Sequence, residues 1–139
     1  MYKQFCLILM LSLIGCSSFQ SSDNRQEIDT SMVSGKYFNN DGFGNNIHLI
    51  LHEDGRYESN LEGPIGIASY SNGAWSKVDD KISFLPEGDS GFLRRALSPM
   101  TILKNDNDVL LVPSKKVEMH QQLMADFGKS TYKYSRITF

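Results

Sequence analysis

Three histidines and a scattering of carboxylates are the side chains of this 139-residue chain that could perform metal or acid–base chemistry. His48 and His52 are four residues apart in a β-type run, which separates them by about 13 Å along an extended strand. One ion cannot bind both, because a histidine–metal bond is about 2 Å long. His120 lies among apolar residues at helical spacing, which favours the edge of the core. The sequence therefore predicts no metal site and no cofactor.

The carboxylates form no catalytic pattern either. Most of them fall at turn signals, where Asp and Glu are usually solvated or bind backbone N–H groups. The sequence contains no Gly-x-Ser-x-Gly elbow, no phosphate-binding loop and no His-Glu-x-x-His motif. We predict no catalytic residues and a non-enzymatic protein. A hydrolase built on two carboxylates that converge in the fold stays an alternative.

The chemistry of Cys16 is indicated by the residues that precede it, MYKQFCLILMLSLIG. A charged start at Lys3, an apolar run of roughly 7–15 residues and a small residue at the cut are typical of a signal peptide. The run is shorter than the ~20 residues that a bilayer-spanning helix needs. The segment Leu13-Ile14-Gly15-Cys16 resembles the lipobox of bacterial lipoproteins.

This resemblance implies cleavage between Gly15 and Cys16, a diacylglycerol on the Cys16 thiol and an acyl chain on its new amino group. Two or more acyl chains hold a protein stably on a membrane. Ser17 stands where Asp would favour the inner membrane, so we expect an outer-membrane protein facing the periplasm, if the cell is Gram-negative. The alternative is an ordinary secretory signal with a chance cysteine near its cut.

Two segments carry side chains suited to binding. Ile65 and Ile67 lie in the apolar segment LEGPIGIA, which Gly and Pro interrupt. An exposed apolar loop often marks a partner or ligand site, and the alternative is a loop folded over one end of a barrel. Phe92, Arg94 and Arg95 end the segment PEGDSGFLRR, where the arginine forks could bind a carboxylate or phosphate. The alternative there is a solvated strand end.

Composition limits the domain organisation and the classes of partner. The formal net charge is −2 and no basic block occurs, so the sequence gives no support for nucleic-acid binding. We expect a cleaved signal peptide over 1–15, a lipidated flexible tether over 16–33 and a single domain over 34–139. A polar coil of the tether's length spans roughly 20–25 Å.

Short β-type runs alternate with turn signals from Gly35 onward, as in an all-β sandwich or barrel. The turn clusters are residues 39–45, 53–55, 79–80, 86–91 and 105–108, and a weak run at 92–97 could add a strand. We predict strands over 36–38, 46–52, 56–60, 68–76, 81–85, 100–104 and 109–112.

Two hairpins can be aligned from the sequence. A three-residue loop with Gly55 in the left-handed conformation pairs Leu51 with Tyr57 and gives one apolar face, with the histidines on the other side. A turn at 79–80 pairs Trp75 with Phe84, so that these rings and Ile82 form one core patch.

Residues 114–128 change period. Ser114 is suited to cap a helix, and Gly128 to end it. One stripe at helical spacing joins Val117, His120, Leu123, Met124 and Phe127. The segment 131–139 then reads as a last strand.

The fold class is therefore mainly β: a small antiparallel β-barrel with one helix in the C-terminal region and a final strand. With Gly35-Lys36-Tyr37 at its start, the body resembles a reduced lipocalin, a family whose barrel opens with Gly-x-Trp. A cracked barrel with the helix across its gap fits the pattern equally. The lipocalin resemblance implies ligand binding.

We expect a lipid-anchored envelope protein that binds a partner protein or a small apolar ligand without catalysis. A pilotin-like lipoprotein that assembles a secretion or outer-membrane machine is the alternative, and an envelope hydrolase is a third class.

Overall fold

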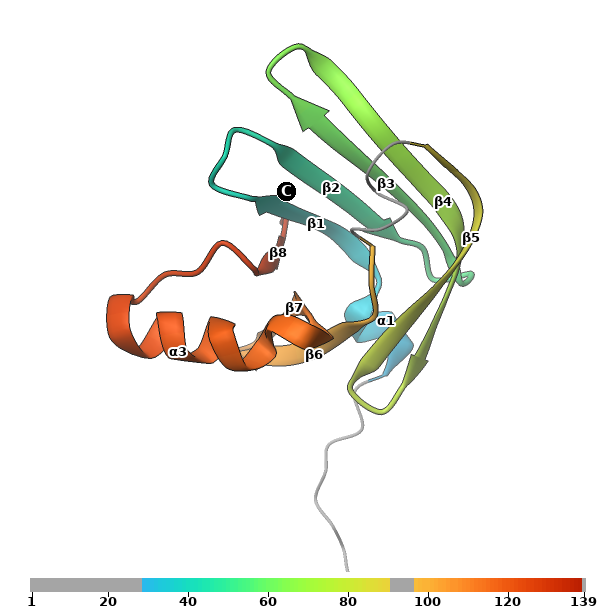
Figure 1. Ribbon diagram of the computed structural model, residues 1–139. Helices are drawn as coiled ribbons and strands as arrows, with labels where there is room; N and C mark the ends of the chain where they lie inside the picture. Colours follow the sequence, from blue (N-terminus) through green and yellow to red (C-terminus); the bar gives the residue numbers. More distant parts are fainter. Residues whose placement is uncertain (1–28, 91–96, 139) are drawn as a thin grey trace, which may run out of the picture.

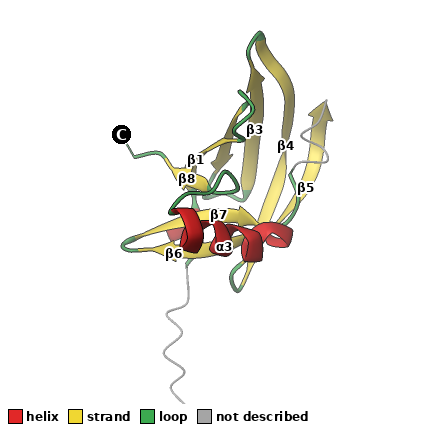
Figure 2. Ribbon diagram, turned by 60° about the vertical axis from the view of Figure 1, so that its left-hand side comes forward, coloured by secondary structure: helices red, strands yellow, loops and turns green. Residues whose placement is uncertain are grey.

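The fold is a closed barrel of eight antiparallel strands in sequence order, described by a computed structural model for residues 29–90 and 97–138 (Figure 1). This confirms the predicted fold class. A short helix precedes the strands, and a longer helix lies between the last two (Figure 2). The elements are α1 (Thr30–Val33), β1 (Gly35–Asn40), β2 (Asn46–Leu51), β3 (Arg56–Gly63), β4 (Gly66–Val78), β5 (Lys81–Ser90), β6 (Met100–Asn105), β7 (Asp108–Pro113), η1 (Ser114–Lys116), α3 (Val117–Phe127) and β8 (Tyr134–Arg136).

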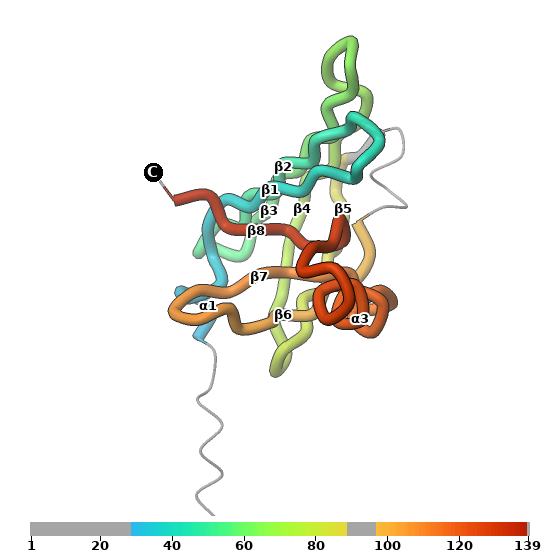
Figure 3. Tube along the Cα trace, turned by 90° about the vertical axis from the view of Figure 1, so that its left-hand side faces the viewer, coloured from blue at the N-terminus to red at the C-terminus, as the bar shows by residue number. Residues whose placement is uncertain are grey.

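The up-and-down order places alternate connections at opposite ends of the barrel. The β1–β2 loop, the β3–β4 turn and the β7–β8 connection with α3 lie at one end, which we call the loop end (Figure 3). Helix α1 and the β2–β3 and β6–β7 turns lie at the other, the α1 end. No helix among the described residues is both long and apolar enough to cross a bilayer.

Both predicted hairpin registers are confirmed. Leu51 pairs with Tyr57, and Gly55 has a φ of 86° in the loop between them. Trp75 pairs with Phe84, and its indole Nε1 donates to the carbonyl of His52 at 2.8 Å. Trp75 and the neighbouring Ile82 are buried, and Phe84 packs against this core. The inward-facing residues, at alternate positions along each strand, therefore supply the core, because the strands pair in the register that buries their apolar faces.

The predicted turn cluster over 86–91 is wrong for its described part, because β5 continues to Ser90. A bulge makes this possible: Gly73 pairs with Pro86, whereas Asn72 pairs with Gly88, so that one residue of β5 is extra. A Cβ on Gly73 would lie 2.2 Å from the carbonyl oxygen of Leu85. Glycine thus lets β4 approach β5 closely, and proline is tolerated at a bulge.

The barrel closes between β5 and β6 through a narrow seam. In the described part of the chain these strands pair only through Lys81 with Thr101 and Ile82 with Met100. Leu97 is buried in the core where the chain enters β6. The rest of the weak run predicted over 92–97 lies outside the described residues.

Helix α3 covers the loop end only in part. Its end at Gly128 is confirmed, since Gly128 has a φ of 67° and its N–H donates to the Met124 carbonyl. The predicted cap at Ser114 is wrong, because the Ser114 hydroxyl bonds Thr101 at 2.9 Å and residues 114–116 form a 3₁₀ turn. Of the helix residues only His120 is buried, while Phe127 is 68% exposed.

The last strand is shorter than predicted, because β8 spans only Tyr134–Arg136. Before it, the side-chain amide of Asn39 donates to the carbonyls of Thr131 and Lys133 at 2.7 and 2.8 Å. These side-chain bonds satisfy the carbonyls that a longer ladder would have paired.

The folded domain begins before residue 34, so the predicted boundary of the tether is too late. Thr30–Val33 form α1, and Val33 is fully buried. The Tyr37 hydroxyl donates to the Val33 carbonyl at 2.5 Å. Cys16, Gly15 and the signal segment lie outside the described residues.

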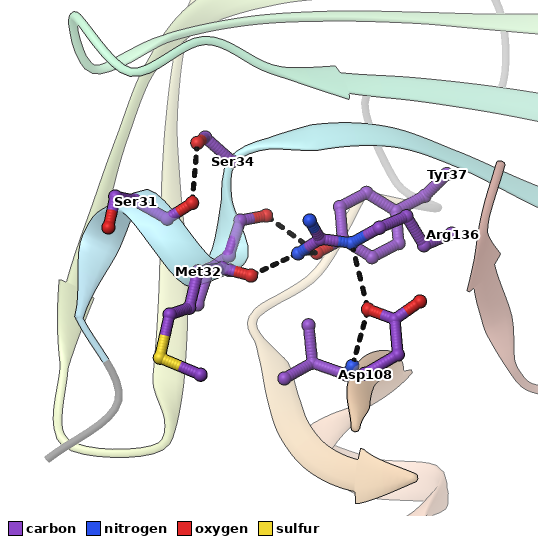
Figure 4. A network of polar contacts seen from close by, with 8 residues as sticks. Ser31, Met32, Ser34, Tyr37, Asp108 and Arg136 are labelled. Carbon is purple, nitrogen blue, oxygen red and sulfur yellow. Dashed lines mark hydrogen bonds and ion pairs between the residues drawn. The ribbon is translucent and has the colours of Figure 1, made fainter. Parts of the chain in front are cut away.

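A polar network fixes α1 to the barrel (Figure 4). The Arg136 guanidinium donates to the Met32 carbonyl and, at 3.1 Å, to the Tyr37 hydroxyl. Its Nε lies 3.0 Å from the Asp108 carboxylate. Burial raises the pKa of the Tyr37 phenol, against the opposing charge of Arg136. The network joins β1, β7 and β8 to α1 and closes this end.

Candidate functional site: the apolar loop end

Ile65 and Ile67 lie at the tip of the β3–β4 hairpin, which projects beyond its neighbours (Figure 1). The predicted loop over 61–68 is wrong in extent, because β3 runs to Gly63 and β4 starts at Gly66. Strand pairing continues to a two-residue turn, although an irregularity beside Leu61 and Glu62 leaves Ala68 as an extra residue on β4. Ile65 is fully exposed at 102% and Ile67 is 68% exposed. These values favour an exposed apolar hairpin end over a loop folded across the end of the barrel.

Phe43 occupies the tip of the adjacent β1–β2 loop and is 90% exposed. Asp41 organises this loop: one carboxylate oxygen accepts from the N–H of Phe43 at 2.7 Å and from that of Asn45 at 3.2 Å. The Asn45 side chain donates to the other oxygen at 2.7 Å. The loop thus has internal hydrogen bonds that hold an aromatic ring in solvent.

The electrostatics of Asp41 support this loop at neutral pH. Burial acts to raise the pKa of the Asp41 carboxyl, but the hydrogen bonds from Asn45 and from the Phe43 backbone outweigh it and lower the pKa below its usual value. A carboxylate with a lowered pKa stays ionised and stabilises its partners until the solution becomes strongly acidic.

Contacts between the loops make the loop end continuous. The position of a Cβ on Gly63 would lie 3.4 Å from the side-chain oxygen of Asn45, so the two hairpin ends are adjacent. A Cβ on Gly42 would lie 3.2 Å from the Thr131 methyl group, in the segment that leads from α3 to β8. Phe43, Ile65 and Ile67 therefore project from neighbouring supports. We call these three side chains the apolar tips.

Helix α3 adds further exposed apolar groups at this end. Met124 and Phe127, from the predicted stripe, are 37% and 68% exposed. His120, predicted at the edge of the core, is the one buried residue of α3. Burial, followed by the nearby charge of Lys133, lowers the pKa of His120, and its buried Nδ1 has no hydrogen-bond partner among the described residues.

The barrel interior becomes polar below the β3–β4 turn. Ser59, Ser69 and Ser71 are buried there on alternate positions of the two strands. Ser71 bonds the Tyr57 hydroxyl at 2.8 Å, and Ser59 donates to the carbonyl of His48 at 2.9 Å. Within residues 29–90 and 97–138, the Ser69 hydroxyl has no hydrogen-bond partner.

Metal and acid–base groups do not gather at this end. Among residues 29–90 and 97–138 no group of three or more His, Cys, Asp or Glu side chains is placed to hold a metal. His52 lies 2.7 Å from Glu58 and His48 lies 4.0 Å from Glu62, both on the outer face. Phe92, Arg94 and Arg95, the other predicted contact residues, lie outside the described residues.

Sequence reasoning identified Ile65 and Ile67 but not Phe43. A single aromatic inside a turn cluster has no periodic signal. The pair Asp41 and Asn45 could have indicated the ordered loop, because Asp and Asn side chains often bond backbone two residues on.

No family of known proteins, no curated protein and no solved structure matches this chain.

Proposed function

We propose that this protein is a lipid-anchored binding module of the bacterial envelope that uses the loop end to hold a partner protein or a small apolar ligand. The observation that carries the proposal is the exposure of the apolar tips, with Phe43 90%, Ile65 102% and Ile67 68% exposed. Large apolar groups gathered at one place on a surface are typical of binding sites.

Among the described residues, two other apolar side chains are strongly exposed away from the loop end. Val78 and Leu85 are 70% and 71% exposed on the β4–β5 hairpin, whose turn lies at the α1 end. They lie within the strands of that hairpin, whereas the hydrogen bonds around Asp41 hold Phe43 outward in a loop. The loop end thus combines exposure with a fixed support.

The lipobox supports the anchored part of the proposal. In this reading the lipid on Cys16 holds the domain at the membrane, and the tether leads to α1. The test is Cys16→Ala in the full chain, with carbonate-washed membranes and the mass of the mature N-terminus as readouts. We expect release into the soluble fraction and loss of the acyl mass; a variant that stays in washed membranes would refute the anchor.

The binding part is tested by a photocrosslinking benzoylphenylalanine at position 43, with Asn107 in the β6–β7 turn as the matched control site. We expect adducts in intact cells at position 43 and few at position 107. Equal yields at both ends would contradict a specific binding surface.

A further inference from the structure

The apolar tips stand on two adjacent hairpin ends, each of which finishes in its own turn. Ile65 lies at the apex of a two-residue turn, and Phe43 at the apex of the neighbouring loop. A stable protein–protein interface buries about 800 Å² on each partner around a packed core. Separate tips can share such a core only if the partner has a matching pocket for each, whereas a fluid bilayer takes up separate tips without such pockets.

The backbone at these tips is also suited to a poorly hydrated environment. Pro64 has no N–H group, and the N–H groups of Gly42, Phe43 and Asn45 already bond the side chains of Asn40 and Asp41. Unpaired backbone groups are costly in an apolar medium. Few donors at the tips would therefore lose a hydrogen bond by entering a lipid interface.

In the β1–β2 loop, the end of the β3–β4 hairpin and the α3 region, the charges of the described residues balance. These segments carry four acids and four lysines: Asp41, Glu62, Glu118, Asp126, Lys115, Lys116, Lys129 and Lys133. This end should therefore bind neutral lipid nearly as well as anionic lipid, because electrostatic attraction adds little.

Chain length lets the loop end reach the membrane. The folded domain begins at α1, at the opposite end of the barrel. The residues from Cys16 to Asp29 span at most about 45 Å when extended, whereas the eight-residue strand β3, which leads to the turn at Ile65, spans about 26 Å. An acyl chain on Cys16 and the apolar tips can therefore occupy the same leaflet.

From these observations we infer that the apolar tips insert into the bilayer surface that carries the anchor, so that the domain is held against the membrane at its loop end. This inference rests on the proposed lipid anchor, and it identifies the bilayer as the apolar partner of the proposed binding surface. In this arrangement the anchor determines where the domain is located, and the apolar tips determine how it is oriented on the membrane.

The test uses the full chain, processed and lipidated, in vesicles of neutral phosphatidylcholine. Ala68→Cys, beside the tips, and Asn107→Cys, at the α1 end, are each labelled with an environment-sensitive fluorophore; both positions are exposed. We expect a lipid-embedded quencher to act about threefold more strongly at position 68, because interfacial side chains lie roughly 5–10 Å into the headgroup and acyl boundary. Aqueous iodide should show the reverse order.

A matched pair of variants gives the control. Ile65→Ser with Ile67→Ser should abolish the difference between the two positions, whereas Val78→Ser, at a side chain as exposed as Ile67, should leave it unchanged. Equal quenching at both positions, in chains that float with the vesicles, overturns the membrane insertion of the tips but leaves the lipid anchor in place. The same result is expected if the loop end binds a protein partner instead of the bilayer. Chains that do not float overturn the inference together with the anchor.

Discussion

The guanidinium carbon of Arg136 lies 5.4 Å from the centre of the Tyr37 ring, and its Nη2 donates to the Tyr37 hydroxyl from a position 99 residues along the chain. The same guanidinium bonds α1 and the Asp108 carboxylate. Arg136 therefore joins the first strand, the last two strands and the helix that precedes the barrel.

Replacement of this arginine should weaken the whole fold. We expect Arg136→Ala to lower the free energy of unfolding by about 1.5–3 kcal/mol, the range for hydrogen bonds to charged groups, because Tyr37 and Asp108 lose their shared partner. Urea denaturation followed by tryptophan fluorescence measures it. Lys104→Ala, an exposed position, is the control; an equal effect there would contradict the proposed role.

Gly73 should tolerate no side chain. Gly73→Ala places a methyl group 2.2 Å from the Leu85 carbonyl oxygen, so the β4–β5 pairing must shift. We expect a loss of about 1–3 kcal/mol or more, as for overpacked sites. Gly63→Ala is matched, since its Cβ would meet the nearest atom at 3.4 Å, and thermal unfolding should show a much smaller change. Similar melting temperatures for both variants would argue against the close approach.

The apolar tips should contribute to binding and not to stability. Ile65→Ser and Phe43→Ser should change the free energy of unfolding by no more than about 0.5 kcal/mol, because both side chains are exposed. Leu49→Ala, in a fully buried position, should cost about 2–5 kcal/mol. If thermal melts showed the tip variants to be as damaging as Leu49→Ala, the tips would be part of the core.

The buried His120 predicts a pH dependence of stability. Burial and Lys133 lower its pKa in the folded state below the value of about 6.5 in the unfolded chain. The unfolded chain then binds the proton first, so this contribution is complete above about pH 6.5 and declines as the pH falls toward the folded pKa. Melting temperatures from pH 8 to 5 should fall less steeply in His120→Gln. A variant with the same slope as the wild type would exclude His120 as the cause.

Local pattern was enough to predict where the strands occur and two hairpin registers, but not the ends of β3, β4, β5 and β8. The alternation around Gly55 and the pairing of Trp75 with Phe84 depend on neighbours in sequence, and both are confirmed. The helix over α3 followed from its period, but the exposure of Phe127 depends on how little of the barrel lies beneath the helix.

Features that depend on distant partners could not be predicted. Val33 looks like the end of a polar tether until Tyr37 and Arg136 are seen to hold α1 on the barrel. Pro86 and Gly88 read as a turn because the glycine that accommodates their bulge lies in another strand. Of the proposed surface, Ile65 and Ile67 were found from apolarity, whereas Phe43 required the hydrogen bonds of Asp41.

Thiol accessibility in native membranes tests most directly whether the loop end is covered in the envelope. Single cysteines at Ala68 and Asn107 would be reacted with a membrane-impermeant maleimide before and after detergent extraction. We expect position 68 to be protected in membranes and reactive after extraction, with position 107 reactive in both. Equal reactivity at the two positions in intact membranes would contradict the account.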